Sequence, residues 1–457
     1  MYYSFYNNND ELIRKYFYSY DYINFNDKNY IEFNFQNGDL TKLPPLPNKL
    51  DDLICDNNKL QSLNYIPLNL LYLSCYSNFL NYLPKLHEKL EYLDCNNNKI
   101  TNLPELPIKL NYLSCSFNII NYLPELHKEL EYLYCNNNKI SYLPKLPNKL
   151  KVLYCNNNEI TNLPELPIKI YYLICNNNKI SYLPKLPNKL KVLYCNYNKL
   201  TELPELPTTL INLNCNYNNL TKLPTLPTTL INLICNYNNL TELPILPTTL
   251  INLNCNNNKI TELPILPTTL INLICDNNKL TVSPLLHVNL EHLNFNYNEL
   301  TQLPELPISL RFLNCIHNKL KQLPVLPINL QILNCVNNNI QKITSLPVNL
   351  IELNCKNNKL IQLPILPINL KILNCSNNNI SKLPDLPISL IELSFSNNLI
   401  TFLPRSIIKC KKLYYYKKYN TYNKKKYIQY LNDLLIFKIE NYYYIKIMKY
   451  YNYKYLF

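Results

Sequence analysis

Eighteen asparagines, from Asn58 to Asn398, recur every 20 residues without one insertion or deletion. Each stands in the same frame, which in one copy runs Leu-Asp-Asp-Leu-Ile-Cys-Asp-Asn-Asn-Lys-Leu from Leu50 to Leu60. A strict period this short indicates one supersecondary unit stacked on copies of itself. Because such a unit cannot bury its apolar side alone, we expect the chain to fold as a solenoid rather than a globule.

Within each repeat, a short segment has the alternation of a β-strand. Leu53 and Cys55 point to one side of that segment, and the residues between and around them point to the other. Leu50, Leu60 and Leu63 continue the apolar set around the coil. The pattern predicts a β-rich solenoid with a parallel sheet on one side and these leucines inside.

The prolines mark a second, extended segment of the repeat. Of the 33 prolines, 17 fall in the column of Pro104 and 15 in that of Pro107. Proline fixes φ near −65° and removes a backbone donor, so we expect this flank to resemble polyproline II. An extended flank crosses the coil in fewer residues than a helix, which explains the short period.

The asparagine column is interpreted as structural. An amide side chain donates and accepts at once, so stacked copies can satisfy backbone groups in the bend after each strand. Asparagine also tolerates left-handed backbone geometry, which is useful in a chain with a single glycine. The positions assigned this structural role are represented by Asn58, Asn98, Asn138, Asn178, Asn218, Asn258, Asn298, Asn338 and Asn378.

The frame L-x-x-L-x-C-x-x-N-x-L-T-x-L-P-x-L-P-x-x resembles the leucine-rich repeat, and more narrowly the short repeats of secreted bacterial effectors. The resemblance covers residues 31–420, with cysteine where that subtype has a β-branched residue or leucine. It implies a horseshoe whose concave face is a parallel sheet and whose function is protein binding. Some effectors of this kind append a ubiquitin-ligase domain, and the residues after Leu403 are too few to form one.

The cysteines and histidines do not indicate a metal site or a disulfide framework. Sixteen of 17 cysteines share one column, from Cys55 to Cys375, and in-register strands would point them the same way. We interpret them as buried apolar filler. Three of the five histidines, His87, His127 and His287, replace prolines in non-adjacent repeats. We find no phosphate loop or nucleophile–base motif and expect no enzyme, no cofactor and no small-molecule substrate.

Three segments are predicted along the chain. Residues 1–30 form an N-terminal cap, with a short helix over 9–18; residues 31–420 hold about 19–20 repeats, with a last unit around Leu413 lacking its asparagine. Residues 421–457 are a Tyr/Lys-rich cap or tail, with helical spacing over 427–437. The net charge is +14, of which residues 405–457 contribute +11, from 13 Lys and Arg against two acids.

The sequence also predicts where the protein acts. Neither a signal peptide nor a membrane-spanning run is recognisable, so a cytoplasmic location is expected. The abundance of Asn, Tyr, Ile and Lys indicates AT-rich codons. This composition suggests an amoebal giant virus as the source, with the host cytoplasm as the location.

A band of tyrosines on the predicted concave face is the candidate binding site. Tyrosine is enriched at interfaces because it offers a large contact area for little loss of side-chain entropy. An alternative is that tyrosine merely suits strands and an AT-rich genome. The band comprises Tyr72, Tyr92, Tyr112, Tyr132, Tyr134, Tyr154, Tyr171, Tyr172 and Tyr194.

The favoured function is therefore a non-enzymatic scaffold that binds an unidentified protein on the concave face. In the first alternative, residues 421–457 bind nucleic acid or an anionic membrane surface, because they interleave lysine with tyrosine. A weaker alternative is a substrate-recognition adaptor for a ubiquitin ligase, which rests on analogy with other repeat proteins.

Overall fold

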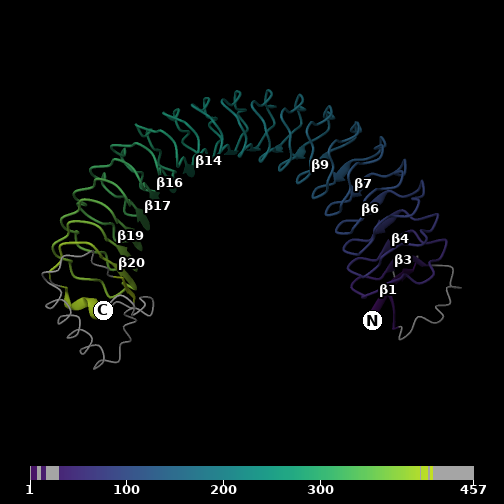
Figure 1. The fold of residues 1–457 in the computed structure, drawn as a ribbon, viewed down its shortest axis with the longest axis horizontal. Coiled ribbons are helices and arrows are strands. Elements are labelled where there is room, and N and C mark those ends of the chain that lie inside the picture. Colours follow the sequence, from purple (N-terminus) through teal and green to yellow (C-terminus); the bar gives the residue numbers. More distant parts are fainter. Residues whose placement is uncertain (1, 8–11, 17–29, 402, 410–411, 415–457) are drawn as a thin grey trace, which may run out of the picture. The chain divides into compact units, whose positions relative to one another are not determined.

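The computed structural model describes residues 2–7, 12–16, 30–401, 403–409 and 412–414. The chain forms two compact units, residues 1–238 and 239–457, and each is described by itself. Both units are parallel β-solenoids in which every 20-residue repeat contributes one short strand (Figure 1). The fold class predicted from the 20-residue period is thereby confirmed.

The first unit contains the strands β3 to β13, paired in parallel and in register. Leu53, for example, pairs with Phe33 on one side and Leu73 on the other. Every strand after β3 is three residues long and ends just before the cysteine column. The strands are β3 (Tyr30–Asn34), β4 (Asp52–Ile54), β5 (Tyr72–Ser74), β6 (Tyr92–Asp94), β7 (Tyr112–Ser114), β8 (Tyr132–Tyr134), β9 (Val152–Tyr154), β10 (Tyr172–Ile174), β11 (Val192–Tyr194), β12 (Asn212–Asn214) and β13 (Asn232–Ile234).

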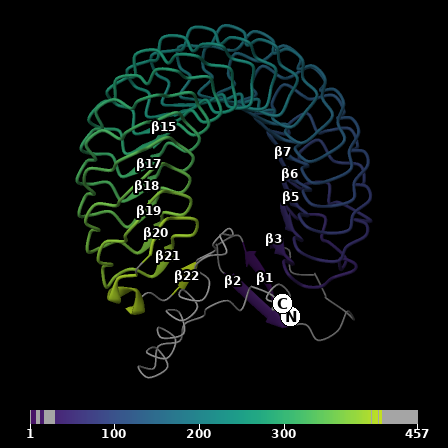
Figure 2. The ribbon, with the colours of Figure 1, turned by 60° about the vertical axis from the view of Figure 1, so that its left-hand side comes forward.

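Two antiparallel strands precede this array. β1 (Tyr2–Asn7) pairs with both β2 (Leu12–Tyr16) and β3, and so covers the edge of the parallel sheet (Figure 2). The prediction of a helix over residues 9–18 is therefore wrong over 12–16. A free sheet edge exposes unpaired backbone groups, and added strands satisfy them where a helix would not.

The second unit has the same construction. Its strands β14 to β22 are parallel and in register, and the last pairing joins Leu393 to Leu413, around which a final unit is predicted. Its single described helix is the 3-10 turn η1 (Arg405–Lys409). The strands are β14 (Asn252–Asn254), β15 (Asn272–Ile274), β16 (His292–Asn294), β17 (Phe312–Asn314), β18 (Ile332–Asn334), β19 (Glu352–Asn354), β20 (Ile372–Asn374), β21 (Glu392–Ser394) and β22 (Lys412–Tyr414). The tail, 421–457, with the helix predicted over 427–437, lies outside the described residues.

The core is built as the apolar columns predict. Leu50, Leu53, Cys55 and Leu60 have no solvent exposure, and their equivalents in later repeats are likewise buried, except Ile400, which is half-buried. The proline flank contains neither helix nor strand through almost its whole length. It ends in a turn in which the amide of Leu110 donates to the carbonyl oxygen of Pro107, at 3.1 Å.

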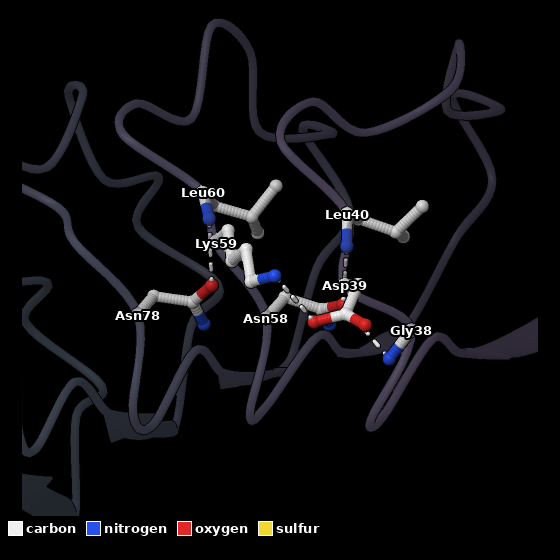
Figure 3. A network of polar contacts seen from close by, with 7 residues as sticks. All are labelled: Gly38, Asp39, Leu40, Asn58, Lys59, Leu60 and Asn78. Carbon is white, nitrogen blue, oxygen red and sulfur yellow. Dashed lines mark hydrogen bonds and ion pairs between the residues drawn. The ribbon is translucent and has the colours of Figure 1, made fainter.

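Each column asparagine connects its own repeat to the one before. The Oδ1 of Asn58 accepts hydrogen bonds from the amides of Gly38 (3.0 Å) and Leu40 (2.9 Å). Its Nδ2 donates to the carbonyl oxygens of Phe35 and Cys55. Asn78 repeats the arrangement one level further on, with its Oδ1 facing the amide of Leu60 (Figure 3). The predicted structural role of this column is consistent with these contacts.

The left-handed residue, however, is the one before the column asparagine. φ is positive at all 18 positions from Asn57 to Asn397, and it is not positive at Asn58 or its equivalents. Asparagine occupies 11 of these 18 turn positions, as the left-handed region favours. Where two asparagines are adjacent, the sequence does not indicate which of them has the positive φ, because asparagine suits both positions of the turn.

Candidate protein-binding site

Three of the predicted tyrosines form a parallel stack on the strand face of the first unit. The rings of Tyr72 and Tyr92 are 4.0 Å apart and inclined by 10°. Those of Tyr92 and Tyr112 are 4.2 Å apart and inclined by 8°. In-register strands place equal positions about one strand spacing apart, which is close to the stacking distance of aromatic rings. Burial, reinforced by hydrogen bonding to Tyr72, raises the pKa of Tyr92 well above its usual value.

The band then spreads over a wider part of the sheet. Tyr112 contacts both Tyr132 and Tyr134, with ring centroids 6.2 Å and 5.4 Å apart. Tyr134 contacts Tyr154 edge to face at 5.0 Å. Burial raises the pKa of Tyr134 to about 12. These rings lean in different directions and present both edges and faces to a ligand.

The last three tyrosines adjoin this group. Tyr171 and Tyr172 meet edge to face at 5.0 Å. Burial raises the pKa of Tyr171, and a hydrogen bond with Tyr132 adds to the shift. Tyr194 pairs with Ile174 in the sheet register. Burial is the main cause of the raised pKa of Tyr154, and the nearby Tyr172 and Tyr194 also contribute to it. All nine predicted tyrosines therefore occupy one surface that runs across seven consecutive repeats.

A carboxyl group adjoins the stacked part of the band, since Asp94 lies two residues after Tyr92 in β6 and therefore on the same face of the sheet. Asp94 sits between Ser74 and Ser114 in the sheet register, and both serines are nearly completely buried. Desolvation raises the pKa of Asp94 to about 6, although the amide of Asn96 donates to its carboxylate at 3.0 Å. Sequence reasoning did not single out Asp94. Its signal was an acid in a strand position that elsewhere in the first unit holds uncharged residues, namely Ser, Tyr, Ile and Asn.

One ion pair borders the broader part of the band. Lys151 Nζ lies 2.5 Å from Glu131 Oε2 and 5.8 Å from the centroid of the Tyr132 ring. Glu131 is the main cause of the raised pKa of Lys151. The tyrosine surface thus has a charged margin of both signs.

The strand face of the second unit is chemically different. Asparagines replace tyrosines there, and Asn314 Nδ2 donates to Asn294 Oδ1 at 2.7 Å. His292 and Phe312 stack at 4.4 Å. The change is visible in the sequence from Ile211, Asn212 and Asn214 onward, whereas the stacked pair is seen in the structure alone.

A second tyrosine ladder lies at the left-handed turn position and was missed by sequence reasoning. Tyr197, Tyr217 and Tyr237 stack with both centroid distances at 4.1 Å, and all three have φ near 50°. Hydrogen bonding to Tyr237 raises the pKa of Tyr217, and burial and hydrogen bonding to Tyr197 add to the shift. Their recurrence at 20-residue spacing is visible in the sequence, but the alternating strand pattern does not include this turn position.

The cysteine column is buried, and one histidine of the flank contacts the backbone of the preceding repeat. The 16 cysteines from Cys55 to Cys375 are buried, and desolvation raises the pKa of Cys135 to about 12. His87 Nε2 lies 3.0 Å from the carbonyl oxygen of Ile66, so this histidine is held within the flank. No group of three or more potential ligands is placed to hold a metal ion anywhere in the described part of the chain. Within the same residues, no helix has the length and apolarity needed to cross a bilayer.

These repeats have the features of a known class of interaction solenoids, and comparison identifies the class. A family model described as leucine-rich repeats in two copies matches residues 128–168. YopM from Yersinia enterocolitica WA-314 is 34% identical, with a TM-score of 0.81 over 84% of this chain and 91% of that chain. The Arabidopsis receptor kinase HAESA, solved with the peptide hormone IDA and the co-receptor SERK1, is 20% identical with a TM-score of 0.54, covering 82% of this chain and 79% of that one. No curated protein matches.

The chain therefore belongs to the leucine-rich-repeat family. Within that family its structure is similar to that of YopM from Yersinia enterocolitica. The likeness to HAESA concerns the fold.

Proposed function

We propose that this protein is a non-enzymatic scaffold that binds a protein partner on the tyrosine band of its first unit. The observation that carries the proposal is the contiguity of nine tyrosines on one open sheet face, eight of them half-buried and Tyr172 exposed. A packed row of aromatic side chains has already lost most of its rotamer entropy, so a partner can bury it with little further ordering.

The chemistry of the band indicates the kind of partner. Its stacked part offers hydroxyl groups in a line, and its wider part offers ring faces around Tyr134 and Tyr154. Such a surface suits a protein segment with apolar side chains and backbone groups that hydrogen-bond to phenols. The complex of HAESA with a peptide and a co-receptor supports this use of the fold by analogy.

The test is an affinity capture from amoebal cytosol with the full chain as bait, at low and high salt. A triple variant, Tyr132→Ala, Tyr134→Ala and Tyr154→Ala, is compared with the wild type. The matched control changes Tyr142 and Tyr182 to alanine, since both are more than half exposed and lie on the proline flank. The proposal expects a discrete protein that is retained at high salt, lost in the triple variant and kept in the control.

Retention of the same partner by the triple variant would contradict the proposed site. RNA or lipid that binds the full chain and is shed by salt would instead favour residues 421–457, because phosphate contacts weaken steeply with ionic strength. A cytoplasmic location and an amoebal-virus origin stay predictions from composition.

A further inference from the structure

The proline flank of the second unit carries exposed aliphatic side chains in two rows. One row follows the column of Ile108 through six consecutive repeats, with Ile328 54% and Ile388 72% exposed. Its members are Val288, Ile308, Ile328, Val348, Ile368 and Ile388. The other row follows the column of Glu105, where Val325 is 83% and Ile365 90% exposed. Contiguous exposed apolar rows of this kind mark interaction surfaces.

The corresponding flank of the first unit is charged. In the second unit, the six flank segments from 281–289 to 381–389, one in each repeat, contain five residues of Asp, Glu, Lys or Arg. The six equivalent segments of the first unit, from 81–89 to 181–189, contain 14. Since the repeat frame is the same, the frame does not require aliphatic residues here. The change in chemistry is specific to the second unit.

From Val325 to Asp385 the Glu105 column alternates between projecting and hollow positions, whereas Ile245, Ile265 and Leu285 in the preceding repeats are all exposed. Ile365 projects, and beside it lies a hollow lined by Thr344, Ser345, Val348 and Pro364. On its other side a second hollow is lined by Lys382, Pro384, Asp385 and Leu403. Val325 is the next projecting residue towards the N-terminus.

We infer that this flank is the dimerisation surface for a second copy of the chain, packed antiparallel to the first. Each repeat along the solenoid forms one level, and the twofold axis lies midway between the levels of Ser345 and Ile365. A twofold contact pairs each level with the level equally far from the axis. Ile365 then faces the hollow at Ser345, and Val325 faces the hollow at Asp385. Projections meet hollows at both pairs of levels.

The charges at the ends of the row support the same axis. One level beyond Val325 the position holds Glu305, and one level beyond Asp385 it holds Arg405. The twofold axis brings Glu305 of one copy to the level of Arg405 of the other, and the pair occurs twice. The aliphatic column pairs with itself, Ile368 with Val348 and Ile328 with Ile388. The aliphatic column thus places apolar against apolar, and the ends of the row place acid against base, while Lys382 and Asp385 line the hollow that Val325 faces.

The size of the patch sets the expected strength. Seven aliphatic side chains lie between the levels of Glu305 and Arg405. Burying one such side chain is worth roughly 1.5–3 kcal/mol, which at about 25 cal/mol per Å² corresponds to roughly 60–120 Å² removed from water. The sum is on the order of 400–800 Å² per copy, at or below the ~800 Å² of a standard interface. The dimer is therefore expected to dissociate on dilution.

Sedimentation velocity of the full chain between about 1 and 100 μM tests the inference, since a dimer of this size should lie in the micromolar range. The expected result is a reversible monomer–dimer equilibrium. Ile365→Glu should raise the dissociation constant about tenfold or more, because it places a charge in an apolar hollow. The control, Ile245→Glu, changes a residue in the same column that is 88% exposed and lies outside the paired levels. It should leave the constant unchanged.

A charge swap tests the axis itself. Glu305→Arg and Arg405→Glu should each weaken the dimer, and the double variant should restore it. These residues are exposed, so circular dichroism should report an unchanged fold in every variant. A chain that is monomeric throughout the range, or a dimer indifferent to Ile365→Glu, would overturn the inference. A dimer lost with Ile365→Glu but not restored by the double swap would overturn the proposed axis.

Discussion

Asn118 Nδ2 lies 3.0 Å from the carbonyl oxygen of Cys95, 23 residues earlier in the chain. The same nitrogen donates to the carbonyl of Cys115 within its own repeat, and Oδ1 accepts from the amide of Ile100 at 2.9 Å. One buried amide thus satisfies backbone groups of two successive repeats.

Replacing this amide should destabilise the solenoid. In Asn118→Ala the amide of Ile100 and the carbonyls lose their partner in a buried place, and each such loss costs about 1–3 kcal/mol. We expect the free energy of unfolding to fall by about 3 kcal/mol in urea titration, with faster hydrogen exchange at Ile100. Asn102→Ala, at an exposed position, is the control and should change neither quantity.

The left-handed turn position makes a graded prediction. Phe117 has φ of 53°, and asparagine tolerates this region better than a residue with a bulky side chain. Phe117→Asn should therefore raise the free energy of unfolding by about 1 kcal/mol. Tyr217→Asn should raise the free energy of unfolding by less than Phe117→Asn does, because it also removes two ring stacks worth about 0.5–1.5 kcal/mol each. Equal gains for the two substitutions in urea titration would contradict this account.

Stability should depend on Asp94 in weakly acidic solution. Its folded pKa, raised to about 6 by desolvation, exceeds the ordinary unfolded value of ~3.9. The folded state therefore binds more protons between these values, and the contribution of Asp94 to stability is lost as the pH rises from about 4 to 6. Asp94→Asn should flatten that dependence and be more stable than the wild type at pH 7. Carboxyl NMR titration measures the pKa directly; a value near 4 would refute the prediction.

Buried thiols should be inert until the chain unfolds. Desolvation raises the pKa of Cys175 to about 12, and the thiolate is the reactive form. Iodoacetamide at pH 8 followed by peptide mapping should leave the 16 column cysteines unlabelled in the native protein. All should be labelled in urea. Rapid native labelling of Cys175 would show that the core opens far more readily than its packing implies.

Much of the fold follows from the sequence because the repeat is its own alignment. Eighteen copies average out local noise, so the positions of Leu53, Cys55 and Asn58 identify strand, core and bend. The N-terminal strands could not be predicted in this way, because residues 1–30 are a single copy. Their strand pairing depends on the edge that β3 exposes, which local propensity does not describe.

The candidate site was predictable in membership but not in geometry. The period placed the nine tyrosines on one face, yet which rings stack and which meet edge to face depends on their side-chain orientations. The carboxyl of Asp94 acquires its raised pKa from burial in the fold and, to a lesser extent, from the charge of Asp56. The aliphatic rows can be recognised in the sequence, since the residue between the prolines changes from Glu105 to Ile365. The exposure of these side chains and the hollows beside them are seen only in the structure.

The asparagine bonds also bear on how such a chain changes over generations. Residues 139–156 and 179–196 are identical, and each junction between repeats uses the same set of amide contacts. Recombination between the two stretches would remove 40 residues and leave a junction indistinguishable from the original one. Repeat number can thus drift in whole steps, with selection acting on the reach of the array rather than on its ability to fold.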